Sequence, residues 1–190
     1  MGKIVLFLGP TLAGQEILKA RLMKEENYNF HKIIKTTTRP KRYNEIDGDN
    51  YHFIIEGATT PNSEIIEKQQ FGEISYFTCS KDIDLVKNNY LDTINLEGLD
   101  SYRNYFGEDV IIPIFVKMNR DERIQLVLTT ERAKENPDFS VMCQKYIADE
   151  SDYSDENIAK RNITDIVENN GDIEETLMQT KIILAKRLYK

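Results

Sequence analysis

The sequence has few of the residues that build metal cages or disulfide frameworks. Among 190 residues there are two cysteines, Cys79 and Cys143, and two histidines. Neither cysteine has a neighbour at the spacing of a metal motif, so we expect no protein-ligated metal and no disulfide scaffold. Long apolar runs are also missing, since none approaches the ~18 residues of a membrane span and no leader precedes the first strand. We therefore expect a cytoplasmic protein with no membrane contact.

Basic residues are outnumbered by acidic ones, 25 to 32, which gives a formal net charge of −7. Such a balance argues against a general nucleic-acid surface or an anionic-membrane surface. A phosphate would therefore have to be bound by a local basic cluster. With 40% hydrophobic residues, the chain is long enough to bury one core, and we treat residues 1–190 as a single domain.

A strand, a glycine loop and a helix open the chain. The apolar run at residues 4–8 meets a loop bounded by Gly9 and Gly14, and apolar residues then recur at helical spacing. Glycines at this spacing let backbone N–H groups converge on a phosphate, and the helix N-terminus adds partial positive charge. The alternative is an ordinary tight turn between a strand and a helix.

The loop lacks the two reactive side chains of the phosphate-binding pattern G-x-x-x-x-G-K-[ST]. Gln15 stands where a lysine would reach the β- and γ-phosphates, and Glu16 stands where a hydroxyl would hold Mg²⁺. The pattern predicts a degenerate phosphate loop. Its candidate residues are Gly9, Thr11, Ala13, Gly14, Gln15 and Glu16.

Strand and helix patterns alternate along the chain, which predicts an α/β fold with a doubly wound, P-loop-type parallel sheet. An apolar run at 110–118 indicates a strand buried on both faces of that sheet. The acidic run at 149–157 is interpreted as solvated surface. Other strands are expected at 31–38, 64–67, 76–79, 92–98 and 163–171. Helices are expected at 15–26, 82–90, 99–106, 120–135, 139–153 and 172–190.

The densest basic cluster consists of Arg39, Lys41 and Arg42, on a loop between two expected strands. A charge run of this kind is most often a solvated loop. Thr37, Arg39, Arg42 and Tyr51 are nevertheless types that clamp a phosphate, because an arginine fork binds phosphate in a bidentate manner. This segment is the candidate local phosphate site.

The segment TTRPKRYNEIDGDNYHF at 37–53 resembles the GMP-recognition stretch T-T-R-x-x-R-x-x-E-x-D-G-x-x-Y-x-F of the guanylate kinase family. Weaker similarity extends over nearly the whole chain. The resemblance implies a P-loop NTPase-like core at about 1–34 and 92–190, an inserted GMP-binding β lobe at about 35–91 and a helical lid at about 129–150. It also implies phosphorylation of GMP to GDP by ATP with Mg²⁺.

Carried over by position, the resemblance assigns one group of residues to GMP: Thr37, Arg39, Arg42, Tyr51, Glu67, Tyr76 and Cys79. Glu67 would accept hydrogen bonds from guanine N1–H and the exocyclic amine. The chain departs from the family at Cys79, where the family has Ser or Thr, and at Thr93 and Asn95, where it has an acidic pair. In the lid, Arg132 and Lys145 are the catalytic candidates.

Three functions are compatible with this pattern. The first is a GMP kinase that works at the full rate or at a reduced one. The second is a catalytically inactive module that binds GMP or a protein partner, and the third acts on another nucleotide. Losing a charge-assisted hydrogen bond costs roughly 1.5–3 kcal/mol, and a carboxylate ~5 Å from a phosphate oxygen adds about 3 kcal/mol at an effective dielectric of ~20. Together these are on the order of three to four decades in rate.

Overall fold

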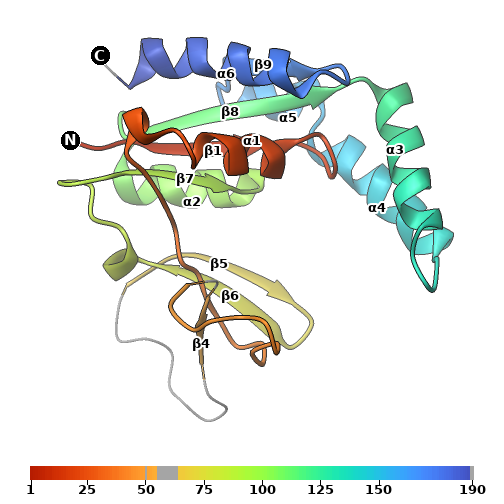
Figure 1. Cartoon of the computed structure of the whole chain (residues 1–190), viewed down its shortest axis with the longest axis horizontal. Helices are drawn as coiled ribbons and strands as arrows, with labels where there is room; N and C mark the ends of the chain where they lie inside the picture. Colours follow the sequence, from red (N-terminus) through yellow and green to blue (C-terminus); the bar gives the residue numbers. More distant parts are fainter. Residues whose placement is uncertain (50, 55–63, 189–190) are drawn as a thin grey trace.

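The computed structural model describes residues 1–49, 51–54 and 64–188 and contains two sheets (Figure 1). The larger sheet has five parallel strands in the order β2–β7–β1–β8–β9. This arrangement confirms the predicted α/β fold with a parallel sheet. The strands are β1 Ile4–Leu8, β2 Phe30–Lys32, β7 Asn89–Thr93, β8 Ile111–Met118 and β9 Asp165–Asn169.

Helices cover both faces of this sheet, which explains why β1 is apolar at every position. Val5 and Phe7 pack in one cluster with residues of α1 and α6, while Leu6 and Leu8 pack on the opposite face with residues of α2 and α5. The helices are α1 Gln15–Leu22, α2 Leu96–Phe106, α3 Arg120–Arg132, α4 Phe139–Asp152, α5 Asp155–Lys160 and α6 Ile173–Arg187.

A smaller sheet of four strands, in the order β4–β3–β6–β5, forms a lobe beside the core (Figure 1). The chain leaves the large sheet at Lys32 and enters the small one at Thr36, so the single strand expected at 31–38 is divided between the two sheets. The strands of the lobe are β3 Thr36–Thr37, β4 His52–Phe53, β5 Ile65–Phe71 and β6 Ile74–Cys79.

The structure corrects the boundaries expected near the middle of the chain. No α-helix forms in the described segment 82–90: residues 83–88 are turns and irregular backbone, and Asn89–Thr93 is strand β7, paired between β1 and β2. The strand expected at 92–98 therefore ends early. Helix α2 follows at once, since the Asn95 side chain caps it by accepting a 2.8 Å hydrogen bond from the Gly98 N–H. Pairing with β1 and β2 thus takes the last two residues of the expected helix into the sheet.

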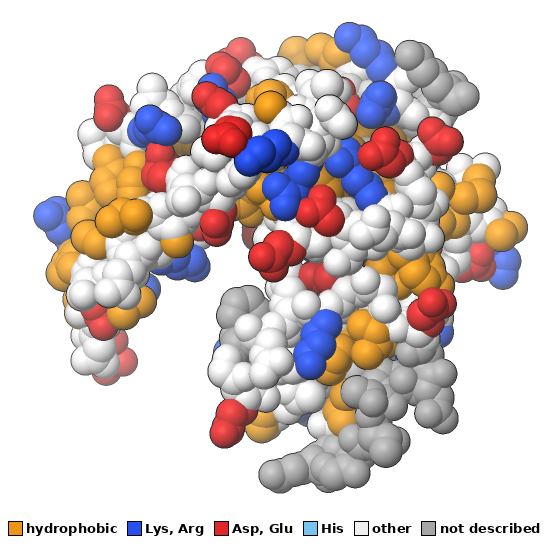
Figure 2. All heavy atoms as spheres, turned by 180° about the vertical axis from the view of Figure 1, so that it is seen from behind, with side chains coloured by type: hydrophobic (Ala, Val, Ile, Leu, Met, Phe, Trp, Pro, Cys, Tyr) orange, Lys and Arg blue, Asp and Glu red, His pale blue; other side chains and the backbone are white. Residues whose placement is uncertain are grey.

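Helices α3 and α4 extend from the core as an arm (Figure 1). Seen from behind, a broad hollow separates this arm from the small lobe (Figure 2). Lys, Arg, Asp and Glu side chains are interspersed over the core above the hollow (Figure 2). Among the residues that the structure describes, no helix is long and apolar enough to cross a bilayer.

Candidate nucleotide site

The glycine loop joins β1 to α1 at the carboxyl edge of the large sheet. Gly9 and Gly14 have φ angles of 154° and 110°. A Cβ atom at Gly9 would lie 2.5 Å from the backbone oxygen of Val116, so only glycine fits there. The Asn169 side chain donates a 2.8 Å hydrogen bond to the Ala13 carbonyl and ties the loop to the end of β9. The backbone path of the loop thus depends on Gly9 and on an anchor from β9.

The two side chains that replace the lysine and the hydroxyl are both hydrogen-bonded within the protein. The Gln15 amide donates to the Pro10 carbonyl at 3.0 Å, so its side chain folds back along the loop. Glu16 accepts a 2.5 Å hydrogen bond from the Thr93 hydroxyl at the end of β7. The Glu16 carboxylate is therefore engaged by the strand beside the loop.

A carboxylate from the arm contacts the loop directly. The Thr11 backbone N–H donates to Asp149 Oδ2 at 2.9 Å. Asp149 is held by the buried Arg123, whose Nη1 lies 3.3 Å from the same oxygen and whose Nη2 lies 2.5 Å from Glu150. The expectation that residues 149–157 are only solvated surface is wrong at these first two positions, because a buried guanidinium requires counter-charges.

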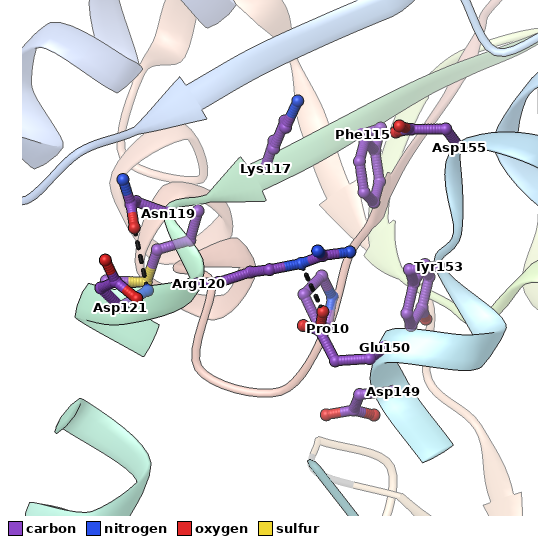
Figure 3. Close-up of a pocket in the computed structure, with 11 residues that line it drawn as sticks. Pro10, Phe115, Lys117, Asn119, Arg120, Asp121, Asp149, Glu150, Tyr153 and Asp155 are labelled. Carbon is purple, nitrogen blue, oxygen red and sulfur yellow. Dashed lines mark hydrogen bonds and ion pairs between the residues drawn. The ribbon is translucent and has the colours of Figure 1, made fainter. Parts of the chain in front are cut away.

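A cavity of about 450 Å³ lies beside the loop, between the end of β8 and α4 (Figure 3). Figure 3 shows the Arg120 side chain crossing it to the Glu150 carboxylate, 2.6 Å away. Acidic side chains outnumber basic ones on its wall, so it does not suit a triphosphate. The charged lining residues are Lys117, Arg120, Asp121, Asp149, Glu150 and Asp155.

A second cavity, of about 260 Å³, lies between the loop and helices α3 and α4. Its wall includes Thr11 of the loop and the lysines Lys134 and Lys145 of the arm. Lys134 pairs with Glu131 at 2.5 Å. Of the two residues predicted for the lid, Lys145 lines this cavity, whereas Arg132 is exposed and lies outside this wall.

In the small lobe, Arg39 is held in place as a fork. Its Nη1 and Nη2 donate to the two carboxylate oxygens of Glu45 at 2.9 and 2.7 Å, and Nη1 also donates to the Pro40 carbonyl at 2.8 Å. The guanidinium carbon lies 5.5 Å from the centre of the Tyr51 ring, and the Tyr51 and Tyr76 rings are 5.6 Å apart. Three of the residues predicted to bind the GMP phosphate thus come together. Glu45 is the glutamate of the pattern T-T-R-x-x-R-x-x-E, and it positions the fork.

Arg42 and Thr37 flank this fork. The Arg42 backbone N–H donates to Glu45 at 2.7 Å, and Arg42 is exposed. Thr37 is fully buried, and its hydroxyl donates to the Ser75 carbonyl at 3.0 Å and accepts from the Arg39 N–H at 3.1 Å. Thr37 therefore holds the backbone of Arg39.

Glu67 is buried with hydroxyl and amide donors around it. One of its oxygens accepts from the Thr78 hydroxyl at 3.1 Å, and the other accepts from the Gln69 amide at 2.6 Å. Cys79 is fully buried on the other face of β6, with its Sγ 4.0 Å from the Thr36 hydroxyl. The assignment of Cys79 beside the base is thus corrected: the hydroxyl next to Glu67 belongs to Thr78.

Comparison with known proteins shows the family to which the chain belongs. A family model described as guanylate kinase matches residues 1–187. The chain belongs to the guanylate kinase family. Guanylate kinases of Mesomycoplasma hyopneumoniae strain 232 and of Mycoplasma mobile are 23% and 24% identical to it, over 100% of this chain and 98% and 95% of theirs.

Two further similarities accompany this membership. The crystal structure of guanylate kinase from Anaplasma phagocytophilum shares the fold, with a TM-score of 0.65 at 19% identity over 100% of this chain and 87% of that chain. MAGUK p55 subfamily member 7 of Danio rerio is 33% identical over 72 residues, which are 36% of this chain and 12% of that protein. Membership in the guanylate kinase family supports phosphoryl transfer between ATP and GMP as the activity of the group.

The Arg39–Glu45 pair should give stability a specific pH dependence. Hydrogen bonds from Arg39, and then from the Arg42 backbone, lower the pKa of Glu45 from 4.5 to about 2. A lowered carboxyl pKa stabilises the fold above pH 4.5 and loses that contribution as the pH falls toward 2. We expect Glu45→Gln to lower the urea midpoint at pH 6, with the difference from wild type shrinking across this window. A difference that is constant with pH would contradict the pairing.

The Asp149 contact predicts that this carboxylate competes with ATP for the loop. Asp149→Ala should tighten binding of ATP with Mg²⁺ by at least about fivefold, because it frees the Thr11 N–H and removes a negative charge from the loop. Titration calorimetry measures the change. Asp152→Ala is the matched control, since it removes the same charge from the same helix. An equal effect of both variants would show that only net charge matters.

Proposed function

We propose that this chain binds GMP in the small lobe and phosphorylates it from ATP, at a rate lowered by its phosphate loop. One contrast carries the proposal. The Arg39 fork is already held by Glu45 within the lobe. At the lysine position of the loop, by contrast, stands Gln15, a neutral amide bonded to the Pro10 carbonyl.

The lobe offers what a purine nucleotide monophosphate requires. Arg39 and Arg42 would hold the phosphate, with Tyr51 and Tyr76 beside it, because arginine forks match phosphate oxygens. Glu67 would accept from guanine N1–H and the 2-amino group. Adenine has neither donor in that arrangement, so the site should prefer guanine.

The loop offers less to ATP than its backbone suggests. Phosphoryl transfer depends on positioning and on neutralising charge, and Gln15 supplies no charge. Lys19 lies one helical turn further on, but its ammonium is 2.5 Å from the buried Asp92. Three cations line the cavity between the loop and helices α3 and α4. Arg123 is paired with Asp149 and Glu150, and Lys134 is paired with Glu131, so we assign the third, Lys145 of the arm, to the transferred phosphate.

Mg²⁺ bound with ATP is the cofactor that the family implies. Beside the loop, the Glu16 carboxylate and the Thr93 hydroxyl meet at 2.5 Å, and both are hard oxygen donors of the kind that Mg²⁺ prefers. In the family pattern the hydroxyl is on the helix and the carboxylates are on the strand. Here the carboxylate of Glu16 is on α1 and the hydroxyl of Thr93 is on β7. The pair fits the ion, so we propose that these two residues would hold it. The ion would supply charge neutralisation at the phosphates.

An inactive binding module is the second candidate. It is favoured by the contact between Asp149 and the Thr11 N–H, which places a carboxylate where a phosphate would bind. The similarity to part of MAGUK p55 subfamily member 7 is compatible with it. In this case the lobe would bind GMP, or a protein partner, without transfer. Turnover separates the two candidates, because only the first produces GDP.

Binding of GMP should depend on the arginine fork through the phosphate. Arg39→Ala should weaken GMP by at least about tenfold and guanosine by less than about twofold, because a charge-assisted hydrogen bond is worth roughly 1.5–3 kcal/mol. Calorimetric titration of both ligands provides the test. Lys41→Ala, in the same basic segment, is the charge-matched control. Equal losses for GMP and guanosine would exclude a phosphate contact.

Turnover should be limited by the missing cation. Wild type should convert GMP to GDP well below the roughly 1–100 s⁻¹ of typical kinases. Gln15→Lys should raise turnover by about tenfold or more, because a charge-assisted contact to phosphate is restored. Gln15→Met is the neutral control and should give no gain. A wild type that already works at ordinary kinase rates would refute the argument.

A further inference from the structure

A buried cation lies beside the carboxylate that is proposed to read the base. Lys35 Nζ is 3.8 Å from Glu67 Oε2 and 3.2 Å from Asp92 Oδ2, and the Lys35 side chain is 16% exposed. Lys19 approaches the other oxygen of Asp92 at 2.5 Å. Two cations therefore balance two carboxylates. Burial lowers the pKa of Lys35, but Asp92 and Glu67 more than offset this and hold it above the usual value, so the ammonium is charged at neutral pH.

The two oxygens of Glu67 have different surroundings. Oε1 accepts from the Gln69 amide, whereas Oε2 lies beside Lys35 and accepts from the Thr78 hydroxyl. The Thr78 oxygen in turn accepts a 3.2 Å hydrogen bond from the Tyr102 hydroxyl. The hydroxyl proton of Thr78 is thus directed at Glu67. On the Oε2 side, Lys35 has three N–H groups and can donate to a ligand.

Guanine presents three groups in a row on the edge that Glu67 would face. The 2-amino group and N1–H are donors, and the 6-oxo group next to N1 is an acceptor. A carboxylate can satisfy the two donors but repels the oxo group. That oxygen therefore needs a donor adjacent to the carboxylate.

We propose that Lys35 donates a charged hydrogen bond to the 6-oxo group of guanine and is a specificity-determining residue of this site. The inference rests on the proposed binding of GMP and deepens it. The hydrogen bond at C6 is then charge-assisted, like those that the Glu67 carboxylate would accept, and is roughly twice as strong as a neutral one. Adenine is rejected there, since its 6-amino group would place a donor against an ammonium.

A purely structural role for Lys35, as the counter-charge of Asp92, makes a different prediction. In that case a variant that removes both charges would keep its base selectivity. Lys35→Met with Asp92→Asn removes one cation and one carboxylate together, so the cluster stays neutral. Asp92→Asn alone is the matched control, because it alters the same cluster and keeps the proposed donor. Thermal unfolding of each variant verifies that it is folded.

The experiment compares GMP with 6-thio-GMP, in which a sulfur atom, a weak acceptor, replaces the 6-oxo oxygen. Calorimetry on wild type should show GMP binding at least about tenfold more tightly than 6-thio-GMP. This ratio should fall below about threefold in Lys35→Met/Asp92→Asn and should persist in Asp92→Asn. The ratio of GMP to IMP, which reports the 2-amino group at Glu67, should stay unchanged in both variants.

Each outcome separates the two claims. An unchanged GMP to 6-thio-GMP ratio in the folded double variant, or a wild-type ratio below about threefold, would overturn the role of Lys35 while leaving GMP binding intact. Failure of wild type to bind either nucleotide would overturn GMP recognition itself, and the role of Lys35 with it.

Discussion

The buried carboxylate of Asp92 links the two parts of this fold. It receives Lys19 from helix α1 of the core and Lys35 from the start of the small lobe, at 2.5 and 3.2 Å. Because unpaired buried charges are costly, the arrangement requires all of its members, including Glu67 on the lobe side. The lobe is thereby held at the carboxyl edge of the large sheet. The glycine loop, which follows β1, lies at the same edge.

The two halves of the site differ in the partners of their phosphate-binding groups. In the lobe, the Arg39 fork is held by a carboxylate of its own segment, and Tyr51 and Tyr76 stand beside it. At the loop, the anion-binding N–H of Thr11 already has a carboxylate partner from the arm. Both groups thus have a carboxylate partner, but the lobe adds the exposed cation Arg42, whereas the loop has the neutral Gln15. This asymmetry is the basis for proposing bound GMP with slowed transfer.

The sequence predicted those parts of the fold that follow from local pattern. The strands at 4–8 and 110–118 were recognisable because burial on both sheet faces makes every position apolar. The start of α2 was missed because its signal was the single capping residue Asn95. The strand expected at 92–98 was placed too late, because the bounds of β7 depend on partners far away in the chain.

In the site, too, the sequence revealed local patterns but not contacts between distant residues. Glycine spacing and the arginine segment singled out the loop and the Arg39 fork, whose ligand roles stay proposals. Thr78, and not Cys79, lies beside Glu67 because side chains alternate along a strand. Thr78 is two residues after Tyr76 and therefore lies on the same face of β6. The contact of Asp149 with the loop joins residues 138 positions apart, so no local pattern could reveal it.

Separate calorimetric titrations of the wild-type protein with GMP and with ATP plus Mg²⁺ test the central claim most directly. The account predicts that GMP saturates its site at concentrations at least about tenfold lower than ATP does, a difference of about 1.4 kcal/mol. ATP that binds as tightly as GMP, or GMP that gives no saturable heat, would contradict it.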